Sequence, residues 1–248
     1  MSIPTHKTVY LLSGGVLHHR KAHDPLIREM LRETGREHPT VACLGAANND
    51  DPAAFDVLHR LFRSSDAGAF EAVPLGALEI DPAHIRARLA AADAIFLGEG
   101  DVDHGMRVLR ASGVIPLLRE RWEQGAVFAG FSAGSILLSR QWVRWHDPTD
   151  DASAEAFDCL GFVPLVCDMH DESDGWEERK TLLRLRRVPD EIGYGVPTSM
   201  GLRVHPDGRI EAVGGWVHRH TFRDGRVDNI GDIWPAFFVH PSEYEYQI

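Results

Sequence analysis

The sequence contains only three cysteines among 248 residues. Their spacing matches no metal-binding pattern, and an odd number cannot pair completely, which is typical of a reducing compartment. No apolar run approaches the roughly 18 residues that a membrane span requires. The N-terminal stretch also lacks the layout of a signal peptide, because its short apolar run leads directly into His-His-Arg. We therefore expect a cytoplasmic protein that does not associate with membranes.

The chain also lacks a basic stripe that would offset its formal net charge of -11, which argues against nucleic acid as a partner. No G-x-G-x-x-G or P-loop lysine pattern is present, so no nucleotide cofactor is expected. His18, His19 and His23 could suggest a metal, but they lie in a loop beside a helix start, without the carboxylate and fixed scaffold that a site needs. We expect neither a metal nor a cofactor.

Alternating apolar strands and amphipathic helices fill the first half of the chain. The patterns predict strands at 7–15, 40–48, 69–76, 94–101 and 126–131. They predict helices at 24–38, 51–65, 81–93 and 103–125, the last broken near Gly113 and Pro116. Such alternation predicts an α/β fold with a parallel sheet covered by helices on both faces. We expect one domain over residues 1–248.

The last third has a different pattern. Residues 200–228 contain two strand pairs around Pro206-Asp207-Gly208 and Asp224-Gly225, which are hairpin turns. We expect these antiparallel hairpins to extend the edge of the sheet. Residues 146–156 are acidic and poor in apolar side chains, so they are predicted to form a surface loop.

A serine stands between two small residues where one buried element gives way to the next, in Gly130-Phe131-Ser132-Ala133-Gly134. One interpretation is purely structural: the serine caps the following helix in a tight turn. However, the motif follows a clear strand and precedes a clear helix, as a nucleophile elbow requires. The glycines would remove clashes in the turn, and the first helix amides would face a developing oxyanion. We therefore expect a nucleophile.

A base and an orienting acid are needed to activate a serine. His170 follows another apolar run, again at the predicted end of a strand, and the acidic loop with Asp147 and Asp150 lies between Ser132 and His170. The chain order Ser, Asp, His is compatible with a triad.

At this point the sequence resembles the serine peptidases that include peptidase E (α-aspartyl dipeptidase) and cyanophycinase. The resemblance runs from about residue 8 to about residue 215. The motifs that carry it are "AIFLGEGD", "VFAGFSAGS", "AFDCLGFVPLVCDMH" and "EIGYGVPTSMGLRV". It implies a three-layer α/β/α fold with a mostly parallel central sheet, similar to the class I glutamine amidotransferases and flavodoxin-like, with antiparallel C-terminal hairpins.

The resemblance also implies roles for individual residues. Ser132 would be the nucleophile and His170 the general base. The family's acid falls about fifteen to eighteen residues after the serine, which selects Asp147 first and Asp150 second. Gly100 and Ala133 would supply the oxyanion amides, and Arg179 would contact the substrate.

Three features depart from the family pattern. Glu99 replaces a glycine in the Gly-rich loop, which places a carboxylate close to the site. His170 is flanked by Asp168, Asp171 and Glu172 rather than by a proline and an aromatic residue. The segment that carries Arg179 is only loosely similar to the family's substrate-contact region.

The leading hypothesis is a serine dipeptidase that acts through an acyl-enzyme and prefers an N-terminal aspartate. Its partner would be a small peptide, and the protein would be a monomer or a homodimer. The alternatives are a cyanophycinase-like or other specificity within the same family, or a catalytically silent binding or regulatory module. An α/β-hydrolase esterase fits less well, because its histidine usually lies near the chain end and an HGGG-type loop is missing here.

Overall fold

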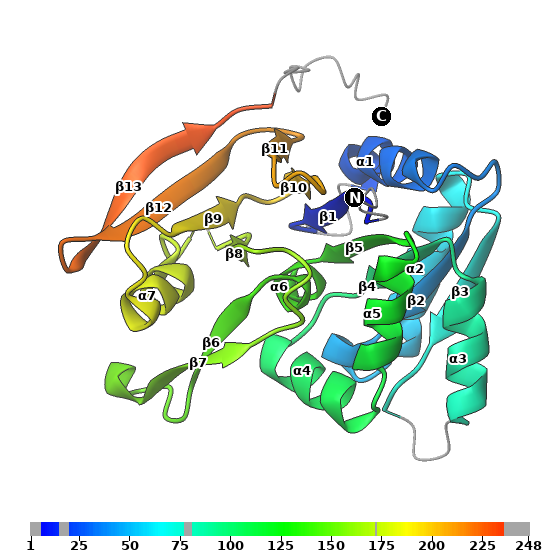
Figure 1. Cartoon of the computed structure of the whole chain (residues 1–248), viewed down its shortest axis with the longest axis horizontal. Helices are drawn as coiled ribbons and strands as arrows, with labels where there is room; N and C mark the ends of the chain where they lie inside the picture. The colour runs from blue at the N-terminus through cyan, green and yellow to red at the C-terminus, as the bar shows by residue number, and fades with distance from the viewer. Residues whose placement is uncertain (1–5, 15–19, 77–80, 172, 236–248) are drawn as a thin grey trace, which may run out of the picture.

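The computed structural model describes residues 6–14, 20–76, 81–171 and 173–235. A seven-stranded sheet forms its centre (Figure 1). In spatial order the strands are β11 (Ile210–Val213), β10 (Gly201–Val204), β1 (Val9–Leu12), β5 (Val127–Phe131), β4 (Ala94–Leu97), β2 (Thr40–Leu44) and β3 (Ala69–Val73). All neighbours from β1 to β3 pair in parallel. The mostly parallel sheet predicted from the alternating pattern is confirmed.

Helices cover both faces of this sheet, because its inner strands are apolar on both sides. In β1, Tyr10 and Leu12 pack in one apolar cluster with α1 (Arg20–Glu33) and α2 (Pro52–Ser64). Val9 and Leu11, which point the opposite way, pack in a second cluster. That cluster includes residues of α3 (Pro82–Ala91), α4 (Val102–Ala111), α5 (Ile115–Glu123) and α6 (Ala133–Leu138). The result is the expected three-layer α/β/α arrangement.

Aspartates fix where three of these helices begin. The side chains of Asp51, Asp81 and Asp101 accept hydrogen bonds from the first-turn amides of α2, α3 and α4. A proline at the first helical position follows Asp51 and Asp81, where its missing amide hydrogen costs nothing. The predicted break between α4 and α5 is confirmed at Gly113, which has a φ of +67°.

A second sheet of four strands lies beside the first (Figure 1). Its order is β13 (Arg226–Ile233), β12 (Val217–Arg223), β9 (Ile192–Val196) and β8 (Val166–Met169). Both predicted C-terminal hairpins form, but only β10–β11 extends the central sheet. The prediction for the other hairpin was wrong, because β12 pairs with β9 instead. One apolar cluster runs from Leu97 and Phe128 to Val166 and Val217, so the two sheets share a core.

Two further elements connect these sheets. The hairpin of β6 (Gln141–Trp145) and β7 (Ala154–Asp158) follows α6 and projects away from the central sheet in Figure 1. Helix α7 (Glu177–Arg186) packs against the second sheet and against this hairpin. The acidic loop predicted at 146–156 covers residues 146–153, and residues 154–156 belong to β7.

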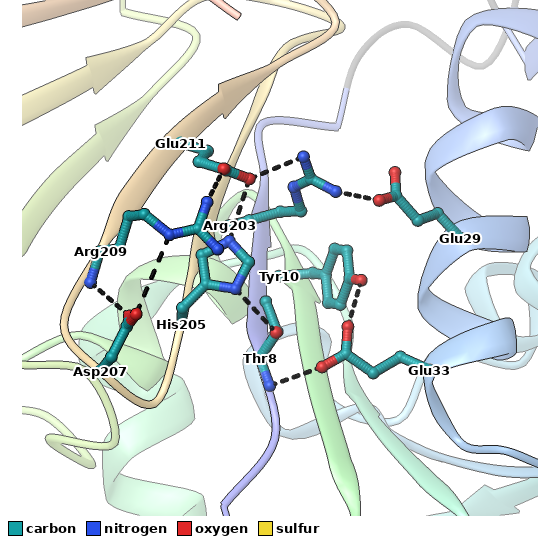
Figure 2. A network of polar contacts seen from close by, with 9 residues as sticks. All are labelled: Thr8, Tyr10, Glu29, Glu33, Arg203, His205, Asp207, Arg209 and Glu211. Carbon is teal, nitrogen blue, oxygen red and sulfur yellow. Dashed lines mark hydrogen bonds and ion pairs between the residues drawn. The ribbon is translucent and has the colours of Figure 1, made fainter. Parts of the chain in front are cut away.

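A polar network ties α1 to the edge of the central sheet (Figure 2). Glu33 accepts hydrogen bonds from the Thr8 amide, at 2.9 Å, and from the Tyr10 hydroxyl, at 2.7 Å. One turn earlier, Glu29 forms an ion pair with Arg203 of β10. Arg203 also pairs with Glu211 of β11 at 2.7 Å. These contacts hold α1 against β1, β10 and β11.

Candidate active site

Ser132 occupies a strained turn between β5 and α6. Its φ of +48° and ψ of -117° are unusual for a residue that has a side chain. A Cβ on Gly130 would lie 2.4 Å from the Gly134 carbonyl carbon, and one on Gly134 would lie 2.1 Å from the Leu97 oxygen. Both positions therefore require glycine, because neighbouring backbone atoms lie where a Cβ would stand. The predicted nucleophile elbow is present in the backbone geometry.

A second serine, which the sequence analysis did not single out, holds the elbow in place. The buried Ser135 hydroxyl lies 2.7 Å from the Gly130 oxygen, to which it donates. It also accepts a hydrogen bond from the Leu12 amide at 2.9 Å. Ser135 thus joins β1, β5 and α6 directly beneath Ser132. Its position three residues after the nucleophile was the only signal in the sequence.

His170 meets Ser132 from the other sheet. The Ser132 Oγ and the His170 Nε2 are 2.7 Å apart, within hydrogen-bond distance. His170 follows β8, with a φ of +49°, and its backbone amide donates to the Val196 oxygen of β9 at 2.9 Å. Ser132 is partly exposed and His170 is exposed, so a ligand can reach both. The structure brings together these two predicted residues, 38 positions apart in the sequence.

The two expected oxyanion amides lie on the loops that follow β4 and β5. Gly100 has a φ of +143°, and a Cβ there would lie 2.1 Å from the Ala47 oxygen, so only glycine fits. The same oxygen accepts the Asp101 amide at 2.8 Å, which fixes the loop. Within the described ranges, the amides of Gly100 and Ala133 have no hydrogen-bond acceptor. Ala47 and its short 3-10 helix (Ala46–Asn48) were not singled out from the sequence.

Asp147 is not brought to His170. It lies in the loop at the outer end of the β6–β7 hairpin, which Figure 1 shows extending away from the β8 end. Its Oδ1 accepts hydrogen bonds from the amide and hydroxyl of Thr149, which lower the pKa of the carboxyl. Asp150 caps the 3-10 helix Asp151–Ser153 through the Ala152 amide. Both carboxylates therefore stabilise the exposed loop. Within the described ranges neither carboxylate makes a hydrogen bond to His170, since the antiparallel pairing of β6 with β7 places both in the loop that joins these strands.

Arg179 is fully buried rather than exposed to a cleft. Its guanidinium carbon lies 4.9 Å from the centre of the Trp176 ring, and its Nη2 donates to His220 Nδ1 at 2.7 Å. The absence of a side chain on Gly195 makes room for it, since a Cβ there would lie 1.9 Å from Nη1. Nε and Nη1 have no hydrogen-bond partner among the described residues. The guanidinium is therefore buried against β9 of the second sheet, and two of its nitrogen atoms donate no hydrogen bond to the described residues.

The surroundings of Arg179 are polar and buried. Asp168, in register with Gly195, is 1 % exposed, and within the described ranges its Oδ2 has no hydrogen-bond partner. Burial, opposed by the Arg179 guanidinium, raises the pKa of the Asp168 carboxyl to about 8. Burial and the same guanidinium lower the pKa of His220 to about 4, so its imidazole is neutral and accepts from Arg179. These groups form a buried charge cluster that the sequence analysis did not find, apart from Arg179.

Among the described side chains, no group of three or more His, Cys, Asp or Glu residues could hold a metal ion. His18, His19 and the side chain of His23 lie outside the described part of the chain. None of the helices in the described ranges combines the length and the apolar character needed to cross a bilayer.

A serine in a nucleophile elbow, hydrogen-bonded to a histidine on a three-layer α/β/α fold, is the arrangement of a serine hydrolase. Comparison with known families identifies a peptidase family. The model of peptidase family S51 matches residues 9–210, so the chain belongs to this family.

Two curated relatives are similar over part of their length. An uncharacterized peptidase, YgaJ of Bacillus subtilis, is 25% identical over 160 residues, which cover 63% of this chain and 65% of that protein. A cyanophycinase of Trichormus variabilis is 23% identical over 221 residues, which cover 84% of this chain and 71% of that protein. The chain thus spans about two thirds of the length of each relative.

Solved structures show the same fold. A peptidase from an acI-B1 actinobacterium superposes with a TM-score of 0.69 at 18% identity, covering 92% of this chain and 97% of that one. A candidate peptidase E of Listeria monocytogenes gives a TM-score of 0.62 at 18% identity, covering 84% and 98%. These similarities confirm the fold class.

Proposed function

We propose that this protein is a serine peptidase that hydrolyses small peptides through an acyl-enzyme, with Ser132 as nucleophile and His170 as general base. The observation that carries the proposal is the 2.7 Å contact between Ser132 Oγ and His170 Nε2 at the end of a nucleophile elbow. Membership of peptidase family S51 supports a peptide as the substrate.

The reaction follows from this geometry. His170 Nε2 takes the Ser132 proton as Oγ attacks the scissile carbonyl carbon, and the Gly100 and Ala133 amides stabilise the negative oxygen. The protonated imidazole then gives its proton to the leaving amine, which produces the acyl-enzyme and releases the first product. Water, deprotonated by His170, attacks the ester and regenerates Ser132. The pair does this without a contact to Asp147 or Asp150 in the arrangement described above.

An N-terminal aspartate is the substrate residue that we propose to test first. A buried arginine with two unused donors, Nε and Nη1, suits a carboxylate. Because Arg179 is 0% exposed, a substrate carboxylate can reach the guanidinium only if the residues that bury it move apart. A preference for neutral or basic residues, as in a cyanophycinase-like or other specificity, is the alternative within the same mechanism.

The test combines covalent labelling with substrate kinetics. A fluorophosphonate is expected to label wild-type protein at Ser132 and not to label Ser132→Ala. Ser132→Ala should lose turnover by roughly 10⁶-fold while its Tm is unchanged. Undiminished turnover in Ser132→Ala would remove Ser132 as the nucleophile. A wild type that is neither labelled nor active would leave a silent binding module. Comparing kcat/KM for Asp-Leu, Leu-Leu and Arg-Leu decides the preference. A higher kcat/KM for Leu-Leu or Arg-Leu than for Asp-Leu would contradict the preference for aspartate.

A further inference from the structure

Glu99 is a carboxylate inside the loop that supplies an oxyanion amide. It lies between Gly98 and Gly100 and is exposed. Within the described ranges its side chain makes no hydrogen bond or ion pair, in contrast to Asp101 two residues later. Asp101 Oδ1 accepts the His104 amide at 2.6 Å and caps α4. Among the described residues, Glu99 is therefore a carboxylate without a partner, and no hydrogen bond from it holds the loop.

The side chain of Glu99 reaches across the strand that carries the nucleophile. The central sheet has the order β1, β5, β4, so β5 with Ser132 lies between the other two strands. Glu99 follows β4, yet its Oε2 lies 3.9 Å from the point where a Cβ on Gly14, after β1, would stand. The Phe131 Cβ lies 3.7 Å from the same point. The carboxylate thus extends over the end of β5, beside the residue that precedes Ser132.

A fixed negative charge at this position opposes the proposed reaction unless a cation accompanies the substrate. The oxyanion would develop at the Gly100 amide, next to Glu99, and like charges close together raise the energy of that state. A peptide with a free amino terminus brings the compensating charge to the right place. Its ammonium is bonded to the carbon adjacent to the first carbonyl, so it enters the site together with the scissile bond.

We propose that Glu99 binds the α-ammonium group of the substrate and thereby restricts cleavage to the bond after a free N-terminal residue. This inference rests on the proposed serine peptidase activity and adds the residue that selects amino termini. It does not depend on the identity of the N-terminal side chain, because the ammonium is common to all such peptides. Glu99 acts as a specificity residue that contacts the substrate.

The experiment compares leucine p-nitroanilide with N-acetyl-leucine p-nitroanilide, which differ in the ammonium alone. For wild type we expect a kcat/KM that is at least roughly 10-fold higher for the free amine. Glu99→Gln should lower this value by roughly 10- to 100-fold, mainly through KM, without lowering the rate on the acetylated compound. Glu37→Gln, which removes an exposed carboxylate elsewhere, is the matched control and should change neither.

Labelling of Ser132 by an uncharged fluorophosphonate separates the two proposals. Labelling of Glu99→Gln at the wild-type rate or faster shows that the nucleophile and its base are intact. Equal losses on both substrates, an unchanged preference in Glu99→Gln, or a wild type that cleaves the acetylated compound as well would overturn the role of Glu99 alone. A wild type that is neither labelled nor active removes the proposed function and this inference with it.

Discussion

Two places in the molecule depend on glycine for opposite reasons. At the elbow, Gly130 and Gly134 let one backbone approach another, with a Cβ on Gly134 only 2.1 Å from the Leu97 oxygen. On β9, Gly193 and Gly195 lie under a side chain, with Cβ positions 3.0 Å from Arg179 Cδ and 1.9 Å from Arg179 Nη1. The first site excludes side chains to shape a turn, and the second excludes them to bury a charge.

This difference predicts which of these glycines can be substituted. The backbone atoms at the elbow belong to β4 and to the first turn of α6, and they cannot move without disturbing the packed sheet and helix. A side chain can be shortened by mutation, so the clash at β9 can be relieved. We therefore expect the elbow glycines to be irreplaceable and the β9 glycine to be replaceable together with Arg179.

The largest effect is expected for Gly134→Ala. The new methyl group would overlap the Leu97 and Gly98 carbonyl oxygens, at 2.1 and 2.8 Å, so the protein should lose more than about 4 kcal/mol of unfolding free energy or fail to fold. Chemical denaturation measures this. Gly113→Ala is the control, because nothing lies within 4 Å of its Cβ and only the φ of +67° opposes it, at about 1 kcal/mol. Similar losses in the two variants would contradict the backbone argument.

Gly195→Ala should be next in size. Its methyl group would displace the Arg179 guanidinium from a buried position, at a cost of roughly 3 to 4 kcal/mol in unfolding free energy. Adding Arg179→Met removes the atom at 1.9 Å and leaves the contact with Trp176 Cδ2 at 2.8 Å. The double variant should therefore lose less stability than the sum of the single losses, by over about 1 kcal/mol. A double variant with strictly additive losses would show that the glycine does not exist to admit this side chain.

The His220 imidazole offers a pH test of the buried cluster. Its folded-state pKa of about 4 lies below the ordinary 6.5, so the stability it contributes is present above pH 6.5 and is lost as the pH falls toward 4. Between pH 7 and pH 4 wild type should lose about 3 kcal/mol more unfolding free energy than His220→Gln. Glutamine keeps an acceptor for Arg179 but cannot take up the proton. Parallel stability curves for the two proteins would argue against a neutral His220.

The smallest effect is expected for Asp147→Asn, which changes the exposed hairpin loop rather than either glycine-dependent site. Because the carboxylate bonds to Thr149 and not to His170, turnover should change by less than about 2-fold. A drop of roughly 10⁴-fold, as measured when an orienting acid is removed elsewhere, would restore the acid predicted from the sequence. Kinetics of the purified variant with any cleaved dipeptide decides between the two.

Local patterns in the sequence determined the central sheet, its covering helices and the elbow. The apolar strands, the Asp-Pro helix starts and Gly130-Phe131-Ser132-Ala133-Gly134 each act within a few residues, so their geometry follows from near neighbours. The positions of Ser132 and His170 at strand ends could be predicted for the same reason, because an apolar run directly precedes each of them.

Only the tertiary structure decided how distant segments meet. β12 pairs with β9 rather than with the central sheet, and the β6–β7 pairing carries Asp147 outward, because strand partners are chosen by packing across the whole chain. The pairing of β9 with both β12 and β8 sets Gly195 between His218 and Asp168. Because Gly195 has no side chain, Arg179 fills the space beside it. The buried Arg179 of α7 depends on partners from β8 and β12 at once, and no single stretch of sequence contains them.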